Sequence, residues 1–313
     1  MQEKSSSLLL IDGNGLMHRA FHALPPLTNS DGEAIGAVYG FLSAFISAVY
    51  QYQPTHLLIC FDFPAPTFRD EIFLEYRSQR PPTDENLKSQ FPKIKKFLEA
   101  AKIDYIEQKG FEADDLMASA SNQFDNVDKV YILSSDKDMM QIVSDKIVMI
   151  SPALNSHITS IITDRKGVFD RLGVNPVQVA DLKAICGDPS DNYKGIAGIG
   201  PKTAAKLLTD WGSLEGIYKN IENISSPKVK NLLINHKQDA LDGKKLSRLV
   251  LDLDIPFKLD RLSTNSIYQD LIPIMDEFGF KSLSKRVNRL LLEKTEKTTV
   301  LSPTISSDQP SLF

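Results

Sequence analysis

The sequence lacks the features of a secreted, membrane or zinc-finger protein. Its 313 residues contain only two cysteines, Cys60 and Cys186, both in apolar segments, and we expect buried, reduced thiols. Too few cysteines and scattered histidines exclude a zinc site. No apolar run approaches the roughly 20 residues that cross a bilayer, and the N-terminus has no signal-peptide pattern. These absences predict a cytoplasmic protein.

A strong net charge of either sign is also absent. The net charge is −4, with 24% charged and 42% hydrophobic residues, as in an ordinary soluble globule. This small negative charge does not exclude a nucleic-acid partner. If nine of the 40 acidic residues form one metal site, the other 31 are outnumbered by the 36 lysines and arginines. Bound metal would add further positive charge.

Three apolar runs, at residues 8–12, 57–62 and 130–136, end at Asp12, Asp62 and Asp136. Short runs rich in branched residues are typical of buried parallel strands. Because ligands of open α/β sheets bind at the carboxyl ends of the strands, we expect the three aspartates to converge. Carboxylates that lie close together repel unless a cation neutralises them, and a hard divalent cation prefers oxygen ligands. The sequence therefore predicts a magnesium-type site.

The remainder of the first half alternates between helical and strand patterns. We predict a loop with Pro25 and Pro26 after the first strand, helices at about residues 36–52 and 85–101 and from Glu112, and strands near 103–106 and 146–150. This βαβ alternation predicts a parallel sheet. From about residue 164 to 292 the pattern is helical and punctuated by glycines. From Lys294 the chain is polar and aperiodic, which is typical of a flexible tail.

Further acidic residues accompany the strand-end aspartates. They are Glu112, Asp114, Asp115, Asp138, Asp188 and Asp191. Taken singly, each has an alternative explanation, because acids are favoured in a first helical turn and Asp188 before Pro189 fits a helix N-cap. Capping does not explain acids at several strand ends as well. Two metals about 4 Å apart, as in phosphodiester hydrolysis, would explain the whole set.

Two other chemistries fit the acidic residues less well. Gly13 and Gly15 follow a strand, but His18 replaces the third glycine of a dinucleotide-binding motif. A phosphatase that uses a strand-end aspartate as its nucleophile would not need the acids at 112–115 or 188–191.

Two segments suit contact with a phosphate backbone. Residues 195–204 form a glycine-paced turn into a helix and are accompanied by lysines, so backbone N–H groups would bind DNA phosphates without reading bases. Residues 68–102 are basic with interleaved aromatics, and Tyr76, Arg77 and Arg80 end a predicted helix in a way that suits phosphate clamping and base stacking. The alternatives are an ordinary helix–turn–helix linker and a solvated helix face.

Jointly, these motifs resemble the 5′ nuclease domain of bacterial DNA polymerase I, a member of the flap-endonuclease superfamily. The matching blocks are residues 9–13 with Arg19, 23–27, 67–69, 76–82, 111–115, 135–138 and 187–204. The resemblance implies an α/β, PIN-like nuclease core at residues 1–163 with a helical arch at about 68–102. It also implies a helical subdomain at 164–293, with a helix–hairpin–helix at about 188–212, followed by a tail at 294–313.

The resemblance further implies residue roles. One Mg²⁺ or Mn²⁺ ion would be held by Asp12, Asp62, Glu112, Asp114 and Asp136, and a second by Asp138, Asp188 and Asp191, with Asp115 near the first group. Arg19 would lie near the scissile phosphate, and Arg77 and Arg80 would belong to the arch with Tyr76. Duplex DNA and a K⁺ ion would bind at the hairpin, through Lys194, Gly195, Gly198, Gly200, Lys202, Thr203 and Lys206.

The sequence also departs from the family pattern. Asn14-Gly15 replaces a Ser-Ser pair, Phe21 replaces a tyrosine, Ser135 replaces a glycine, and Tyr193-Lys194 replaces an Ile-Pro pair. Residues 63–66 replace a stretch that often holds lysines. None of these departures removes an acidic ligand, so activity is still expected.

The end of the tail carries a second resemblance. Gln309, Ser311, Leu312 and Phe313 match the bacterial sliding-clamp peptide, with Pro310 in place of the usual leucine. The alternative is a chance apolar end. A clamp peptide on a flexible tether would raise the local concentration of the nuclease at a replication site.

We therefore expect a metal-dependent 5′→3′ exonuclease and flap endonuclease that removes RNA primers and displaced flaps in DNA replication and repair. Its partners would be DNA with 5′ ends, nicks or flaps, RNA–DNA primers, the sliding clamp and a DNA polymerase. The alternative is a catalytically silent DNA-junction-binding protein recruited by the clamp. The concentrated acids argue against this alternative, because a binder gains nothing from negative charge beside DNA.

Overall fold

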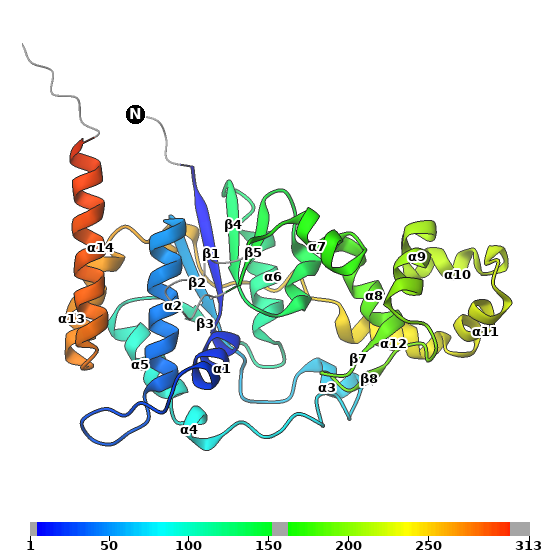
Figure 1. Ribbon diagram of the computed structural model, residues 1–313, viewed down its shortest axis with the longest axis horizontal. Helices are drawn as coiled ribbons and strands as arrows, with labels where there is room; N and C mark the ends of the chain where they lie inside the picture. Colours follow the sequence, from blue (N-terminus) through cyan, green and yellow to red (C-terminus); the bar gives the residue numbers. More distant parts are fainter. Residues whose placement is uncertain (1–4, 152–161, 301–313) are drawn as a thin grey trace, which may run out of the picture.

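A six-stranded sheet lies at the centre of the molecule (Figure 1). The computed structural model describes residues 5–151 and 162–300, and side chains as far as residue 292. In spatial order the strands are β3 (Tyr105–Ile106), β2 (His56–Cys60), β1 (Ser7–Asp12), β4 (Lys129–Leu133), β5 (Ile147–Ile150) and β6 (Ile162–Thr163). Within this sheet, β5 and β6 pair antiparallel and all the other neighbouring strands pair parallel. The prediction of a mainly parallel α/β sheet is confirmed, and the antiparallel edge strand is an addition to it.

Helices cover both faces of this sheet (Figure 1). In the first half they are α1 (Gly13–Ala23), α2 (Gly36–Tyr52), α3 (Phe68–Ile72), α4 (Glu85–Lys88), α5 (Phe91–Ala100) and α6 (Ala113–Gln123), with the 3₁₀ segment η1 (Lys137–Ile142). In the second half they are α7 (Arg165–Leu172), η2 (Pro176–Gln178), α8 (Val179–Cys186), α9 (Pro201–Trp211), α10 (Leu214–Lys219), η3 (Ile221–Asn223), α11 (Pro227–Asn235), α12 (Lys237–Ser247), η4 (Leu259–Leu262), α13 (Ile267–Glu277) and α14 (Lys281–Val300). Among the described residues, no helix is both long and apolar enough to span a membrane.

Alternate residues of β1 belong to two different cores. Leu8 and Leu10 pack in one core with side chains of α6, whereas Leu9 and Ile11 pack in the other with side chains of α2. All four are fully buried. Because successive side chains of a strand point to opposite faces, a sheet of such strands must be covered on both sides. This two-sided packing makes the sheet a firm support for the residues at its carboxyl edge.

The strand register aligns the carboxyl ends of the three central strands. β1 ends at Asp12, which pairs with Cys60, the last residue of β2. On the other side, β1 pairs with β4 up to Leu133. Asp62 and Asp136 follow within two or three residues of these strand ends. The register therefore carries all three aspartates to the same edge of the sheet.

Helix α1 begins directly after β1, where we predicted a loop. The side chain of Asp12 caps the helix, because its Oδ1 accepts a hydrogen bond from the backbone N–H of Gly15 at 2.7 Å. Leu16, Met17 and Ala20 are buried, and Leu16 and Met17 belong to the same core as Leu9 and Ile11 of β1. A strand-end aspartate that is also an N-cap leaves no room for a loop. The loop prediction is wrong for residues 13–23, and the proline-containing loop follows the helix.

The segment around Asp188 is a hairpin and not the start of a helix. Helix α8 ends at Cys186, and β7 (Gly187–Asp188) then pairs antiparallel with β8 (Tyr193–Lys194). The next helix, α9, begins only at Pro201. The N-cap explanation for Asp188 is therefore wrong, and a tight hairpin precedes the glycine-paced turn.

The predicted arch is helical only in part. Helix α3 ends at Ile72, and the helix predicted at about residues 85–101 is divided into α4 and α5. Tyr76 lies in a series of turns between α3 and α4 and not at a helix end. Arg77 has a φ of 53°, a left-handed conformation that is uncommon for a residue other than glycine. The surroundings of Arg77 must therefore hold it in place.

The last two helices pack on the first half of the chain. Leu271 of α13 and Leu283 of α14 are buried in the same cluster as the apolar face of α2. Arg286 donates hydrogen bonds to the hydroxyls of Ser43 at 2.9 Å and Ser47 at 2.6 Å, both on α2. Figure 1 shows α13 and α14 beside α2, far from α9 to α11. The division of the chain at residue 163 stays a prediction, and the end of the second half packs on the first.

The two cysteines differ in their surroundings. Both are free thiols, but Cys60 is fully buried in β2 whereas Cys186 is only partly buried at the end of α8. Burial raises the thiol pKa of both residues, that of Cys186 to about 11. The expectation of free thiols holds for both residues, and the expectation of full burial holds for Cys60 only.

Candidate metal and nucleic-acid site

The strand-end aspartates form one electrostatic group. Asp12 accepts hydrogen bonds from the backbone N–H of Gly15 at 2.7 Å and from the hydroxyl of Ser134 at 3.0 Å. Burial nevertheless raises the pKa of Asp12 to about 7, and the neighbouring carboxylates of Asp62 and Asp136 add to this increase. A buried carboxyl group beside two other carboxylates is stabilised when a proton or a cation neutralises it.

Asp114, in the first turn of α6, belongs to the same group and is the least supported of these acids. It is buried, and its side chain has no hydrogen bond or ion pair with any residue in the part of the chain that the structure describes. Burial raises its pKa well above the ordinary value, and the carboxylates of Asp136 and Asp12 raise it further. An unpaired buried carboxylate is costly. A cation with a preference for oxygen ligands, such as Mg²⁺ or Mn²⁺, fits this donor set.

Arginines neutralise several of the other acids. Glu112 forms ion pairs with Arg77 at 2.5 Å and with Arg69 at 3.4 Å. Burial raises the pKa of Glu112 to about 7, although both arginines lower it. Asp191 is contacted by Arg77 at 3.0 Å and by Arg80 at 2.7 Å. Arg77 thus bridges the acids at the start of α6 and those of the β7–β8 hairpin.

Lys183 on α8 neutralises the second group of acids. Its ammonium group pairs with Asp138 and, at 2.6 Å, with Asp188. Burial raises the pKa of Asp138 to about 6 despite this pairing. For Asp188 the hydrogen bonds from Lys183 and Ser190 outweigh burial and lower the pKa to about 2. Sequence reasoning missed Lys183, and the available signal was a lone lysine in the apolar stretch 182–186.

Asp115 is committed to a buried ion pair. It accepts hydrogen bonds from two guanidinium nitrogens of Arg69, at 2.7 and 2.8 Å, and from the backbone N–H groups of Glu112 and Val250. Arg69 donates a further bond to the carbonyl of Leu246 at 2.8 Å. This arrangement favours a positioning role for Asp115, which ties the start of α6 to the segment after α12. From the sequence, Arg69 lay in the basic segment 68–102 and in the matching block 67–69, but no partner was predicted for it.

Two residues that depart from the family pattern support the strand ends. The hydroxyl of Ser135 accepts a hydrogen bond from Arg19 at 2.9 Å. The amide oxygen of Asn14 accepts one from the backbone N–H of Asp62 at 3.1 Å. The Asp62 carboxylate in turn accepts one from the backbone N–H of Ala113 at 2.8 Å. These bonds hold Arg19 and Asp62 beside the carboxyl edge of the sheet.

The acids are gathered but are not arranged as a finished metal site. Within residues 5–151 and 162–292, no three His, Cys, Asp or Glu side chains stand where they could hold a metal ion as they lie. The cationic groups of Arg77 and Lys183 lie against Glu112, Asp138 and Asp188 instead. Binding of an ion therefore requires some of these ion pairs to open, and the individual ligand roles stay predictions.

The glycine-paced turn packs closely against the end of α8. A side-chain carbon at Gly195 would lie only 2.2 Å from the backbone nitrogen of Gly187, so no larger residue fits there. Gly198 has a φ of 90°, which a residue with a side chain rarely adopts. Gly200 is the N-cap of α9 and faces open space. The predicted DNA-binding side chains around this turn are exposed: Lys194, Lys202, Thr203 and Lys206.

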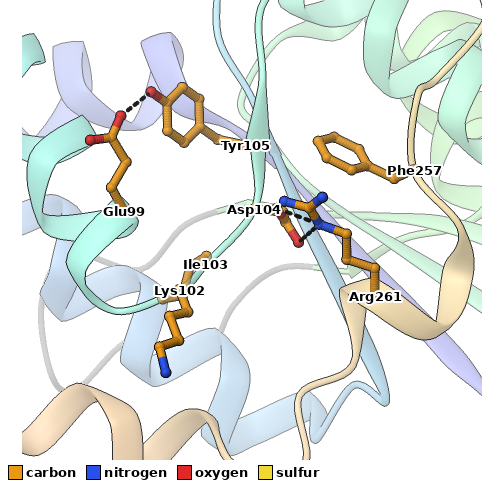
Figure 2. A pocket seen from close by; sticks show the side chains of 7 residues that line it. All are labelled: Glu99, Lys102, Ile103, Asp104, Tyr105, Phe257 and Arg261. Atoms are coloured by element: carbon orange, nitrogen blue, oxygen red, sulfur yellow. Dashed lines mark hydrogen bonds and ion pairs between the residues drawn. The ribbon is translucent and has the colours of Figure 1, made fainter.

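One cavity adjoins the acids. It has a volume of about 440 Å³ between the hairpin, the glycine-paced turn and the segment before Arg80, with Gln79, Asp188, Asn192, Tyr193 and Lys194 in its wall. Another cavity, of about 580 Å³, contains none of the predicted site residues (Figure 2). Its lining residues are Glu99, Lys102, Ile103, Asp104, Tyr105, Phe257 and Arg261, and in it Arg261 pairs with Asp104 at 2.7 Å. We therefore place the candidate site at the first cavity and the sheet edge beside it.

Comparison with known proteins establishes the family. The model of the N-terminal resolvase-like domain of 5′-3′ exonucleases matches residues 7–173, and the model of their C-terminal SAM fold matches residues 174–270. The chain belongs to the 5′-3′ exonuclease family. This family member is 36% identical over 300 residues to the 5′-3′ exonuclease of Aquifex aeolicus, which covers 93% of the chain and 99% of the relative. The expected family and the expectation of a nuclease are thereby confirmed.

Two further relatives define the extent of the match. DNA polymerase I of Caldicellulosiruptor bescii is 36% identical over 284 residues, and the match covers 90% of this chain but only 33% of the polymerase. The chain thus spans about a third of that polymerase. The crystal structure of the bacteriophage T5 D15 flap endonuclease with DNA and metal ions has the same fold, with a TM-score of 0.60 at 20% identity over 91% of this chain and 98% of that chain.

Proposed function

We propose that this family member is a divalent-metal-dependent 5′→3′ exonuclease and 5′-flap endonuclease. The observation that supports this most strongly is the convergence of the strand-end acids around Asp114, which has no partner of opposite charge in the described part of the chain. Two bound ions would supply an activated water and would stabilise the leaving oxygen of a phosphodiester.

The carboxylates divide into two candidate ligand sets for Mg²⁺ or Mn²⁺. The first set is Asp12, Asp62, Glu112, Asp114 and Asp136, and the second is Asp138, Asp188 and Asp191. Once ions neutralise the acids, Arg77 and Arg80 become free to bind substrate phosphates, as does Arg19 at the sheet edge. Guanidinium groups suit this task because they bind phosphate oxygens in pairs.

Duplex DNA would bind at the glycine-paced turn, where the N-terminus of α9 and three exposed lysines face solvent. Backbone N–H groups and lysines bind phosphates without reading the bases, so recognition would depend on the shape of the junction. A K⁺ ion at the carbonyl groups of this turn would reinforce the grip. DNA with 5′ ends, nicks or flaps and RNA–DNA primers are the substrates that this arrangement would accept.

A flap-cleavage assay tests this proposal. The purified protein should cut a 5′-flap duplex with Mg²⁺ or Mn²⁺ and should fail to cut it with EDTA. Asp138→Ala and Asp191→Ala should reduce turnover far more than DNA affinity, whereas Arg77→Ala and Lys202→Ala should chiefly weaken substrate binding. Folded protein that binds the flap but never cleaves it would favour the silent junction-binding alternative.

The cellular role that we propose is the removal of RNA primers and flaps in replication and repair, in the cytoplasm and together with a DNA polymerase. The peptide at Gln309, Ser311, Leu312 and Phe313 lies outside the described residues, and clamp binding remains our proposal for it. Deletion of residues 309–313 should reduce retention on immobilised sliding clamp. Equal retention of the shortened and the full chain would refute this part.

A further inference from the structure

His18 and His22 lie one helical turn apart on the same face of α1. Their ring centroids are 6.5 Å apart, and their ring planes are inclined by 32°. Residues four apart on a helix are neighbours on its surface. From the sequence alone we excluded a zinc site, because the histidines looked scattered and a loop was predicted where α1 lies. The helix brings this pair together.

The ring nitrogens of this pair are free. Neither His18 nor His22 makes a hydrogen bond or an ion pair with any residue in the described part of the chain. By contrast, the Nδ1 atom of His56 lies 2.8 Å from a threonine hydroxyl, and that of His236 lies 2.9 Å from a carboxylate. The ring nitrogens of His18 and His22 are therefore available to bind a ligand.

Aromatic neighbours hold the two rings without engaging these nitrogens. The ring of Phe91 lies 6.4 Å from that of His18, and the ring of Phe21 meets that of His22 edge-on at 5.3 Å. His18 is half-buried, and burial together with the nearby His22 lowers its pKa below the usual value. An imidazole that is neutral at physiological pH is in the form that binds metal ions.

We propose that His18 and His22 form a two-histidine site for a transition-metal ion of the Zn²⁺ type at the rim of the acidic cluster. Imidazole suits Zn²⁺, Cu²⁺ and Ni²⁺, whereas Mg²⁺ prefers oxygen ligands. Two histidines at this spacing on a helix are also the zinc ligands of H-E-x-x-H metalloproteases. Here Arg19 stands in the position of the glutamate base, so the site binds an ion without activating a water for hydrolysis.

The residues around the histidine pair determine which further ligands a bound ion would have and how the ion would affect cleavage. No further His, Cys, Asp or Glu among the described residues completes a three-ligand group, so water fills the remaining positions. The charges of Asp62 and Arg80 act on His18, which places the pair next to the proposed catalytic acids. A bound Zn²⁺ ion would alter the charge beside Asp62 and reduce cleavage.

Calorimetric titration with Zn²⁺ in a large excess of Mg²⁺ tests the proposal, because Mg²⁺ occupies the carboxylates and leaves the imidazoles open. The native chain should bind one Zn²⁺ ion, and His18→Ala and His22→Ala should each weaken binding at least about tenfold, that is by ~1.4 kcal/mol. His236→Ala is the matched control and should bind like the native chain. Equal affinity in all four proteins would overturn the proposal.

The ligand atoms can be identified independently of affinity and of activity. Electron paramagnetic resonance of the Cu²⁺ complex should show hyperfine splitting from two imidazole nitrogens in the native chain and from one in each single variant. Carboxylate oxygens give no such splitting. A Cu²⁺ spectrum without nitrogen splitting, or Zn²⁺ binding that persists in the double alanine variant and is lost in Asp62→Asn, would assign the ion to the acids and refute a histidine site.

Discussion

Among the acids of the candidate site, Asp114 is the one whose side chain has no hydrogen bond or ion pair with a described residue. Its Asp114→Asn variant keeps the shape of the side chain and removes the charge that repels Asp12 and Asp136. We expect the variant to unfold at a higher temperature than the native chain in EDTA, by about 2–4 °C for a gain of ~1 kcal/mol, and to lose the stabilisation that Mn²⁺ gives the native chain. Thermal unfolding with and without Mn²⁺ measures both effects.

Asp115→Asn is the matched control for this prediction. It alters the neighbouring carboxyl group, which is paired with Arg69, and it should lower the unfolding temperature in EDTA. Two results would show that Asp114 is not an uncompensated carboxylate that binds metal. One is a lower unfolding temperature in EDTA for Asp114→Asn, as expected for Asp115→Asn. The other is stabilisation of Asp114→Asn by Mn²⁺ as large as that of the native chain.

Arg69 and Asp115 form an ion pair in which both side chains are almost fully buried, with exposures of 2% and 0%. Arg69→Met removes one partner and leaves a charged carboxylate in the interior. Breaking a buried pair in this way costs about 3–5 kcal/mol, and we expect that loss in the free energy of unfolding measured with urea. The double variant Arg69→Met/Asp115→Leu should recover part of it. A loss below about 1 kcal/mol for the single variant would show that the pair is not structural.

At the scale of elements, the turns at residues 73–80 are tied to the acids by the groups that we assign to phosphate binding. The backbone N–H of Arg77 donates to the carbonyl of Asp191 at 3.1 Å, and the side chain of Asn192 donates to the carbonyl of Glu75 at 2.8 Å. Together with the ion pairs of Arg77, these bonds explain how its left-handed backbone is held. Metal ions and substrate would compete with the same side chains, so this segment is where the site must rearrange.

The close packing of the glycine-paced turn against the end of α8 depends on Gly195. Gly195→Ala would drive a methyl group into the backbone of Gly187, whereas Gly200→Ala places one in open space. We expect Gly195→Ala to weaken flap binding at least about tenfold, with faster amide hydrogen exchange in residues 187–200. Gly200→Ala should stay close to the native chain in both measurements. Equal affinity of the two variants would show that the packing of this turn does not control DNA binding.

Some elements could be predicted from the sequence and others could not. The strands and α2 carry strong apolar patterns, and the structure places them close to the predicted positions. The start of α5 has a signal in the sequence that the prediction overlooked, because Pro92 lies in the first turn of the helix. The contact between this break and α2 has no such signal: the buried side chain of Gln90 accepts hydrogen bonds from the backbone N–H groups of Ala37 at 2.8 Å and Val38 at 3.3 Å. That contact joins residues more than 50 positions apart.

At the scale of the whole molecule, the acids were predictable and their cationic partners were not. Strand register follows from local patterns, and it carries Asp12, Asp62 and Asp136 to one edge. Arg69 reaches Asp115 across 46 positions of the chain, and Lys183 reaches Asp138 across 45. Such pairs depend on which distant segments pack together in the folded chain, and no local pattern contains that information. In the structure the predicted acids lie near one another, and several of them form ion pairs with arginines and a lysine that were not predicted as their partners.

The arrangement of the molecule makes a net charge of −4 compatible with the DNA binding that we propose. The sheet carries the acids between two helical ends, with α13 and α14 on one side and α9 to α11 on the other (Figure 1). Much of the negative charge is paired internally or is gathered at the proposed metal site. Exposed lysines border the glycine-paced turn, which is where we expect the duplex.

The central claim is that the gathered acids bind divalent metal once their arginine and lysine partners move aside. Anomalous scattering from crystals grown with Mn²⁺ tests it most directly. We predict at least one strong peak within coordination distance of Asp12, Asp114 and Asp136, with Arg77 withdrawn from Glu112. Crystals of active protein that show no Mn²⁺ at these carboxylates, with the ion pairs of Arg77 and Lys183 intact, would contradict the account.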